Sequence, residues 1–236
     1  MEEQKRSFFE EGQILLFNKP LYWTSFDLVG KVRNIIRKTH NIKNIKVGHA
    51  GTLDPLATGL MIICTGKFTK KIDTFRDLDK EYVATFHAGA TTPSFDLETE
   101  TDYTFPTNHI TEGLIRRKLS EFVGEQKQMP PIYSAKQIDG KRAYEFARKG
   151  IEKELTPVTV FFREIEFLSF SFPEIKVRIR CSKGTYIRSF ARDLGIALES
   201  GCYLSALERT AIGDYTVASA FDVEKFQEYA EQMQQN

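Results

Sequence analysis

A glycine-rich segment from Val47 to Lys67, VGHAGTLDPLATGLMIICTGK, places one carboxylate, that of Asp54, among small residues. Gly51 and Gly59 allow backbone conformations that are closed to other residues, and Pro55 restricts Asp54 to an extended or turn conformation. A lone carboxylate is a poor candidate for paired acid–base chemistry, but it can act as a nucleophile or stabilise an electron-poor sugar carbon. The segment predicts an active-site loop, and an ordinary surface turn is the alternative.

Two other side chains, Tyr82 and Arg188, fit such a site. The alternation from Lys80 to Ala88 predicts a strand that carries Tyr82 at its start. The turn before Tyr186 leads into an expected helix with Arg188 in its first turn, where the helix dipole disfavours a cation. This conflict predicts an anionic partner for Arg188, since a guanidinium holds a carboxylate in its ionised form. A plain surface arginine is the alternative.

Several familiar catalytic motifs are absent from the sequence. Lys67 fails as a P-loop lysine, because Met61 stands where the first glycine is needed and Phe68 stands where Ser or Thr should follow. No GxSxG, HExxH or GxGxxG motif occurs. The three cysteines form no CxxC pair and the four histidines are scattered, so neither a disulfide framework nor a zinc site is expected. We expect reduced thiols.

The net charge is only +1, but the sign of the charge is segregated along the chain. Six Lys or Arg and no acidic residue lie between Leu28 and Leu53, and the same holds between Ile175 and Arg192. Basic segments that flank the Asp54 region favour a nucleic acid as partner, because phosphate contacts supply much of the affinity for RNA or DNA. Solvated helix and strand faces are the alternative.

Helices and strands are mixed without the regularity of βαβ units, which predicts an α+β fold with a mixed, mostly antiparallel central sheet. Helices are expected at residues 24–39, 67–75, 111–123, 141–149 and 186–200, and a polar helix at residues 222–236. Strands are expected at residues 13–17, 60–65, 80–88, 134–138, 158–162, 165–172, 175–181, 203–211 and 215–217. No linker or repeat divides residues 1–236, so one domain is expected.

The sequence carries no targeting or membrane segment that we recognise. The N-terminal MEEQKRSFFE has no apolar h-region, and the longest purely aliphatic or cysteine run, residues 60–64, is too short to cross a bilayer. We therefore expect a cytoplasmic monomer without membrane association or an obligate protein partner.

Six motifs, in order along the chain, resemble those of the TruB family of tRNA pseudouridine synthases. Residues 48–59, GHAGTLDPLATG, resemble the family's GHxGxLDPxAxG motif. Residues 18–25, NKPLYWTS, resemble NKPxGxTS, with Leu21 and Tyr22 replacing its usual residues. The remaining matches are KEY at residues 80–82, PIYSAK at 131–136, CSKGTYIR at 181–188 and LERT at 207–210. The resemblance implies a pseudouridine synthase fold, with helices and loops flanking the sheet around an RNA-binding cleft.

The resemblance also implies an activity, the isomerisation of the T-loop uridine of tRNA, position 55, to pseudouridine. Asp54 would attack or stabilise the ribose while uracil is detached at N1, rotated and rejoined at C5, and Arg188 would pair with Asp54. Tyr82 would stack on the target base and take part in proton removal at C5. A base cannot be reattached through another atom while it is stacked, so it must be flipped out. No metal or organic cofactor is required.

The remaining implied site residues would contact RNA. His49 would help to occupy the space of the flipped nucleotide, and Tyr186 and Leu207 would line the pocket. The other expected RNA contacts are Lys19, Gly51, Tyr133, Lys136 and Lys183.

Two departures from the family's sequence limit how far its residue roles apply to this chain. Thr92-Pro93-Ser94 stands where many members have TDT, and Glu98-Thr99 stands where they have Asp-Gly, so contacts of this loop are not carried over. Only 26 residues follow Thr210, too few for the C-terminal PUA domain with which many relatives hold the acceptor arm. We therefore expect binding to depend on the T-arm of tRNA and on basic surfaces such as residues 136–149.

Three other functions are alternatives to a tRNA pseudouridine synthase. A non-catalytic RNA-binding or RNA-folding protein would keep the pocket without the reaction, but Asp54, Tyr82 and Arg188 are all present. A pseudouridine synthase acting on ribosomal RNA, guided by a small RNA, would normally carry the PUA domain. A glycoside or nucleoside hydrolase would need a second acid near the first, and the sequence offers no clear one.

Overall fold

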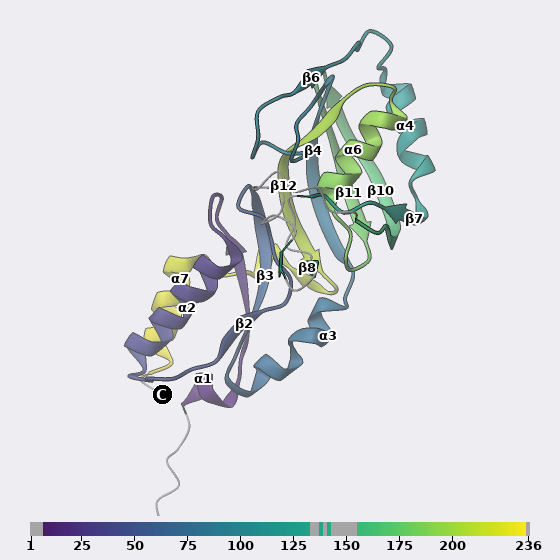
Figure 1. Ribbon diagram of the computed structural model, residues 1–236. Helices are drawn as coiled ribbons and strands as arrows, with labels where there is room; N and C mark the ends of the chain where they lie inside the picture. The colour runs from purple at the N-terminus through teal and green to yellow at the C-terminus, as the bar shows by residue number, and fades with distance from the viewer. Residues whose placement is uncertain (1–6, 133–136, 139–140, 143–154, 235–236) are drawn as a thin grey trace, which may run out of the picture. The chain divides into compact units, whose positions relative to one another are not determined.

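The computed structural model describes residues 7–132, 137–138, 141–142 and 155–234 (Figure 1). The chain forms two compact units. The first unit consists of Met1–Glu81 and Glu208–Asn236, and the second unit of Tyr82–Leu207. The expectation of a single catalytic domain stays a prediction.

The first unit packs helices against short antiparallel strands. Its strand order is β1-β3-β12, with β2 paired to β3 and β13 paired to β12. Its elements are α1 (Phe8–Glu11), β1 (Ile14–Lys19), α2 (Ser25–Thr39), β2 (Val47–His49), β3 (Ala57–Thr65), η1 (Gly66–Lys71), α3 (Ile72–Arg76), the end of β12 (Cys202–Ile212), β13 (Tyr215–Thr216), η2 (Val217–Ser219) and α7 (Val223–Gln232).

Helix α2 begins where the sequence predicts. Thr24 is its N-cap, and the Thr24 hydroxyl accepts a hydrogen bond from the Asp27 amide at 3.1 Å while the Asp27 carboxylate accepts one from the Thr24 amide at 2.8 Å. The buried face of α2 contains Leu28, Val29, Val32, Ile35 and Ile36. Helix α7 lies beside α2 in Figure 1 and contributes Phe226, whose ring packs edge-on against Phe17 of β1.

One residue of α2 departs from the expected pattern. The helical spacing of Phe26, Val29 and Ile36 predicts that Phe26 is buried with the other two, but 62% of its surface is exposed. Phe26 lies in the first turn of α2, and its ring meets the His49 ring in a T-shaped arrangement with the centroids 5.8 Å apart. The prediction for Phe26 was therefore wrong, because periodicity alone does not show where the end of a helix extends beyond the core.

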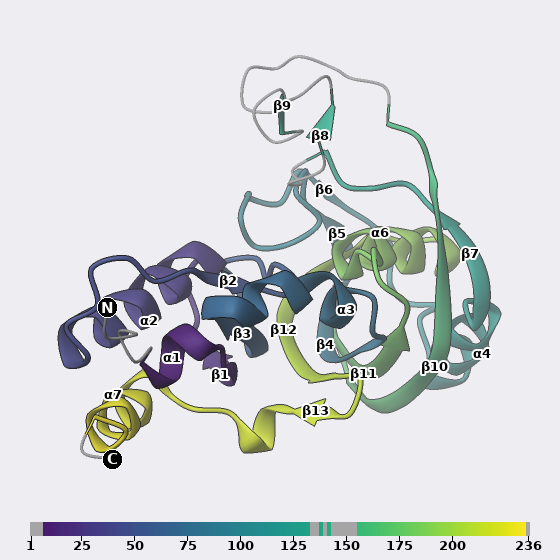
Figure 2. The ribbon, with the colours of Figure 1, turned by 90° about the horizontal axis from the view of Figure 1, so that it is seen from below.

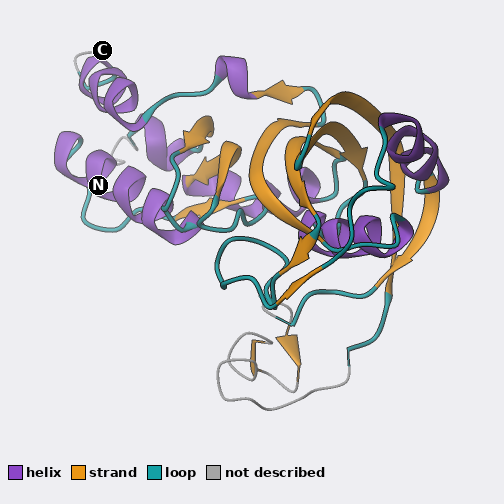
Figure 3. Cartoon of the chain, turned by 90° about the horizontal axis from the view of Figure 1, so that it is seen from above, coloured by secondary structure: helices purple, strands orange, loops and turns teal. Residues whose placement is uncertain are grey.

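The second unit is a curved sheet with two helices. Its strand order is β12-β4-β11-β10-β7. Its elements are β4 (Lys80–Ala88), β5 (Ala90–Thr91), β6 (Tyr103–Thr104), α4 (Glu112–Glu121), β7 (Gly124–Gln128), β8 (Gln137–Ile138), β9 (Lys141–Arg142), β10 (Val158–Ser171), β11 (Glu174–Cys181), α6 (Ile187–Ala197) and the start of β12. Figures 2 and 3, from opposite sides, show strands β4, β11 and β10 curving around α6.

Phe190 explains why α6 sits against these strands. Its ring is fully buried and lies 5.5 Å from the ring of Phe86 in β4, 5.2 Å from Phe162 in β10 and 5.0 Å from Phe122 after α4. Aromatic residues bury large areas, so this cluster fixes the start of α6, and with it Arg188, against the sheet. The strict burial alternation of β11 agrees with the sequence, since Ile175, Val177, Ile179 and Cys181 are buried while its basic residues are exposed.

The α+β class and most of the longer elements match the sequence predictions, whereas the short elements α1, β2, β5 and β6 were not predicted. Strand β7 was missed, because its sequence GEQKQ is polar and exposes alternate residues at the sheet edge. Residues 158–171 form one bulged strand instead of two. The helix expected at residues 141–149 was wrong at Lys141 and Arg142, which pair with β8, while residues 143–154 lie outside the described residues. Within the described chain, no helix is long and apolar enough to span a membrane.

Gly59 marks the point where β3 approaches β12 too closely for a side chain. A β-carbon built on Gly59 would lie 2.3 Å from the carbonyl oxygen of Arg209, and the φ angle of Gly59 is +103°. We therefore expect Gly59→Ala to lower the free energy of unfolding by about 3 kcal/mol or more, as measured by urea denaturation.

Gly30 provides the matched control for this substitution. A β-carbon there meets no atom within 4 Å in the middle of α2. Gly30→Ala should raise the free energy of unfolding by about 0.5–1 kcal/mol, because alanine has the higher helix propensity. Equal effects of the two substitutions would show that the close approach at Gly59 is not a constraint.

Candidate active site

Asp54 lies on the connection between β2 and β3, and we call residues 50–57 the Asp54 loop. The Ala50 amide donates to the carbonyl oxygen of Ile62 at 2.9 Å, and the Ala57 amide donates to the carbonyl oxygen of Asp54 at 3.0 Å. Gly51 adopts a φ angle of +114°, which only glycine readily supplies. Asp54 itself is half-buried. The glycine and proline of this segment thus form a closed loop that presents one carboxylate, as its sequence predicted.

The first residue of α2 holds the residue before Asp54. The Ser25 hydroxyl accepts a hydrogen bond from the Leu53 amide at 2.9 Å and donates one to the Leu53 carbonyl oxygen at 3.1 Å. Both side chains are buried, with Ser25 only 2% exposed. This hydroxyl therefore satisfies both backbone groups of a residue that has no strand partner.

Arg209 also forms hydrogen bonds with the backbone of the Asp54 loop. Its guanidinium donates to the carbonyl oxygens of Leu60 at 2.7 Å, Gly51 at 3.2 Å and Thr52 at 3.4 Å. Arg209 is 1% exposed, and it is the largest fully buried side chain in the described part of the chain. The rigid, planar fork of arginine can reach three carbonyl groups at once, which the single ammonium of lysine cannot.

Lys19 is a buried cation near Asp54. Its ammonium donates to the carbonyl oxygens of Trp23 at 2.7 Å and Pro20 at 2.9 Å, and the residue has no exposed surface. Burial lowers the pKa of Lys19 from 10.5 to about 8, and the charge of Asp54 opposes this shift. Lys19 thus remains mostly protonated at pH 7. Its predicted contact with RNA stays a prediction, and its burial disfavours it.

The turn held by Lys19 contains a strained residue. Tyr22 adopts a φ angle of +66°, and its amide donates to the carbonyl oxygen of Pro55 at 2.8 Å. For a residue with a β-carbon, this left-handed conformation is about 1–2 kcal/mol less stable than the right-handed one. The turn therefore lies against the Asp54-Pro55 segment at a cost in backbone energy.

His49 precedes the Asp54 loop at the end of β2. Burial lowers the pKa of His49 below 6.5, and the positive charge of Arg209 adds to that effect. The imidazole is therefore neutral at pH 7. Its Nδ1 atom is buried and makes no hydrogen bond within the described residues, while the ring edge contacts Phe26 at a centroid distance of 5.8 Å.

The second unit supplies an acidic partner for Arg188. Arg188 is 5% exposed, and its Nε atom lies 3.6 Å from Oδ2 of Asp96. The Arg188 guanidinium also donates to the carbonyl oxygen of Ser94 at 3.4 Å, and the other oxygen of Asp96 accepts from the Glu98 amide at 2.9 Å. The anionic partner that the helix dipole conflict predicted is present in Asp96. Pairing of Arg188 with Asp54 stays a prediction.

The start of α6 is fixed by a side-chain amide. Gln128, at the end of β7 and 2% exposed, accepts from the Tyr186 amide at 2.8 Å and donates to the Tyr186 carbonyl oxygen at 3.1 Å. Ser189 adds a hydrogen bond to the carbonyl oxygen of Met129 at 2.7 Å. The backbone that carries Arg188 is thereby tied to the sheet on both sides.

The remaining predicted site residues fall into three groups. Tyr82 is buried in β4 with 8% of its surface exposed, and Leu207 is half-buried in β12. Lys183 is exposed in the turn before α6. Tyr133 and Lys136 lie outside the described residues, as does most of the segment 136–149 that we expected to bind RNA. The roles of all of them stay predictions.

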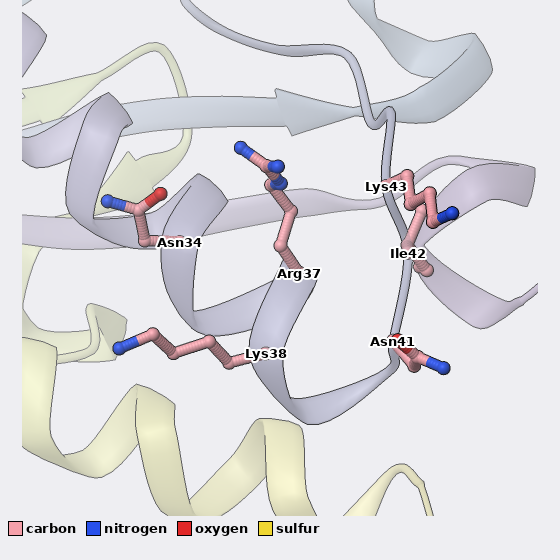
Figure 4. A pocket seen from close by; sticks show the side chains of 6 residues that line it. All are labelled: Asn34, Arg37, Lys38, Asn41, Ile42 and Lys43. Atoms are coloured by element: carbon pink, nitrogen blue, oxygen red, sulfur yellow. The ribbon is translucent and has the colours of Figure 1, made fainter.

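A basic hollow lies at the C-terminal end of α2, in the first unit. It measures about 360 Å³ and is shown in Figure 4. The side chains around it come from the last turns of α2 and the loop that follows, and no acid is among them: Asn34, Arg37, Lys38, Asn41, Ile42 and Lys43. Three of the six cations in the first basic run thus lie around one hollow, and positive charge of this kind favours the binding of phosphate groups.

Sequence reasoning missed four side chains that position the site: Ser25, Asp96, Gln128 and Arg209. Ser25 and Arg209 belong to recognised motifs, but their contacts join segments 28 and 158 residues apart. Asp96 is one of eight carboxylates between Asp73 and Asp102, so composition does not distinguish it. Groups of three or more His, Cys, Asp or Glu side chains suited to a metal ion are not found among the described residues.

Comparisons with known proteins indicate one family for this chain. A family model described as TruB family pseudouridylate synthase (N terminal domain) matches residues 37–187. The chain is 55% identical to a tRNA pseudouridine synthase B of Phocaeicola vulgatus over 96% of each chain. It is also 55% identical to a tRNA pseudouridine synthase B of Bacteroides fragilis, over 95% of this chain and 96% of that protein.

A solved structure shares the fold. It is an H/ACA RNP bound to a substrate RNA containing 2'-deoxyuridine, and its matching chain superposes with a TM-score of 0.67 at 24% identity. The match covers 94% of this chain but 54% of that one, so this chain spans about half the length of that relative. At this identity the likeness bears on the fold alone.

The contacts of Arg209 predict a local effect of its removal. We expect Arg209→Met to lower the free energy of unfolding by about 3 kcal/mol or more, because three carbonyl groups lose their donor. Amide hydrogen exchange, followed by mass spectrometry, should accelerate in the Asp54 loop before it accelerates in α2.

Arg76→Met is the matched control. The Arg76 side chain is 56% exposed and pairs with Asp73 at 2.8 Å on the surface, so its loss should cost less than about 1 kcal/mol. Unchanged exchange in the Asp54 loop of Arg209→Met would contradict the supporting role of Arg209.

Proposed function

The chain belongs to the TruB family of pseudouridylate synthases, and from that premise we propose that it isomerises the T-loop uridine of tRNA, at position 55, to pseudouridine. The high identity to two tRNA pseudouridine synthases over nearly their whole length supports this activity. The observation that carries the assignment of residues is the Asp54 loop, in which Ser25 and Arg209 hold the backbone next to one half-buried carboxylate.

The reaction is an internal rearrangement that needs no oxidant or reductant. The bond between ribose C1′ and uracil N1 breaks, a bond between C1′ and C5 forms, the proton on C5 leaves, and N1 ends with a proton. In the proposal Asp54 acts on the ribose, either by attack or by stabilising the electron-poor sugar. The fixed loop aims this carboxylate before the substrate arrives, so little reorganisation is needed during the reaction.

Arg188 and Tyr82 complete the proposed catalytic group. Arg188 would hold the Asp54 carboxylate ionised, and its existing pair with Asp96 keeps the guanidinium in place. Tyr82 would stack on the flipped uracil and take part in removal of the C5 proton. Its place in β4 gives the ring a rigid support.

The surroundings of this group suit a flipped nucleotide. The neutral, half-buried ring of His49 can fill the gap that the flipped nucleotide leaves without adding charge. Tyr186 and Leu207 would line the pocket, and Gly51, Lys183, Tyr133 and Lys136 would contact the RNA. The basic hollow at the end of α2 would bind phosphates of the backbone.

Asp54→Asn tests the catalytic proposal most directly. The variant should reduce tritium release from a T-arm hairpin labelled at uridine C5 by about 1,000-fold or more, equal to about 4 kcal/mol, because a carboxamide is neither a nucleophile nor an anion. Its affinity for the hairpin should change little, as measured by filter binding.

Asp73→Asn is the control, since the same change falls on a side chain that is 83% exposed in α3. It should release tritium at the parent rate. Undiminished release by Asp54→Asn would remove Asp54 from the mechanism. Failure of the parent protein to release tritium would favour the non-catalytic RNA-binding function.

A second prediction concerns which part of tRNA is needed. If the protein recognises the T-arm, the isolated hairpin and the full-length tRNA should differ in kcat/KM by less than about tenfold, or ~1.4 kcal/mol. The same tritium assay with both RNAs measures the ratio. A larger loss with the hairpin would show that the acceptor stem contributes to binding.

A further inference from the structure

Tyr22 combines exposure with backbone strain. Its side chain is 75% exposed, and its φ angle of +66° lies in the left-handed region. A bulky residue in this region is uncommon, and glycine adopts it without a steric penalty. In the motif NKPxGxTS, Tyr22 stands at the glycine position. Folding of the turn alone would favour glycine, so the aromatic ring calls for another explanation.

The position of Tyr22 suggests an explanation for its aromatic ring. The Tyr22 amide donates to the carbonyl oxygen of Pro55 at 2.8 Å, which places this backbone directly against the residue that follows Asp54. On either side of Tyr22, the carbonyl groups of Pro20 and Trp23 accept hydrogen bonds from the buried Lys19 ammonium. The turn is therefore fixed, and it carries an exposed aromatic ring next to the proposed catalytic carboxylate.

A second exposed ring lies near the same loop. Phe26, three residues after Trp23, is 62% exposed and touches the ring of His49. Solvent-exposed aromatic rings on a rigid support, with cations nearby, are the means by which proteins stack the unpaired bases of RNA. Adjacent nucleotides in a stack lie about 3.4 Å apart along a strand. A ring anchored beside Pro55 is thus suited to a nucleotide close to the one that Asp54 attacks.

We infer that the ring of Tyr22 stacks on an unpaired base of the RNA loop, one or two nucleotides from the modified uridine. The inference rests on the proposed function, because it places the modified uridine at Asp54. Tyr22 is then a substrate-binding residue, and the strain in its backbone is retained because the ring contributes to RNA affinity instead of stability.

Two substitutions separate the ring from the strain. Tyr22→Ala removes the ring and keeps a β-carbon in the strained conformation, whereas Tyr22→Gly removes both. Both variants should raise KM for the labelled T-arm hairpin by about fivefold or more, with kcat changed less than about twofold, because stacking is lost in each. Tyr22→Gly should also unfold at a higher urea concentration than Tyr22→Ala. Tyr22→Phe should retain the parent KM.

Tyr103→Ala is the matched control, since Tyr103 is 68% exposed in β6 of the second unit. It should leave KM unchanged. A parent KM in Tyr22→Gly, or a rise of equal size in Tyr103→Ala, would overturn the inference. Absence of tritium release from the parent protein would instead be a failure of the proposed function, so the two failures are distinguishable.

Abasic substitutions in the hairpin identify the stacked base. Removing the stacking base should raise KM for the parent protein by about fivefold or more, but it should have no further effect on Tyr22→Ala. The base should lie within two nucleotides of the modified uridine. If every abasic hairpin weakened the parent and Tyr22→Ala by the same factor, the ring would have no base as its partner, and the inference would fail.

Discussion

The buried guanidinium of Arg209 is the interaction on which the Asp54 loop depends. Backbone carbonyl groups that lie outside the pairing of strands need other hydrogen-bond donors. Arg209 supplies three hydrogen bonds from one rigid group, to Gly51, Thr52 and Leu60. Its own backbone approaches Gly59 so closely that only glycine fits there. One arginine thus explains how the backbone of this loop is held in one shape.

The same arrangement determines the electrostatics around Asp54. Lys19 and Arg209 are buried cations of the first unit, and the charge of Asp54 favours the protonated form of Lys19. Both cations donate hydrogen bonds to backbone carbonyl groups, Lys19 to Pro20 and Trp23, and Arg209 to Gly51, Thr52 and Leu60. His49, kept neutral by burial and by Arg209, adds shape without another charge.

The sequence was sufficient for the local features and for the family, but not for the long-range contacts. Capping residues and periodicity predicted α2, β4, β11 and α6, because those signals lie within a few residues of each other. Strand β7 was missed, since it lies at a sheet edge and buries little. The Arg188 dipole conflict predicted that an anion was needed but could not choose Asp96 among the acids of its loop. Which acid pairs with Arg188 depends on which distant segments the core brings together.

Tyr22 shows why a departure from a motif carries more information than another match. Matching residues such as Ser25 and Arg209 are explained by the loop that they support. Tyr22 adopts a backbone conformation that glycine adopts without a steric cost, and Tyr22 is 75% exposed to solvent. Neither packing nor hydrogen bonding of the ring compensates for the strain among the contacts described for the first unit. A local conflict between sequence and backbone conformation is expected at functional sites, where binding has been favoured over stability.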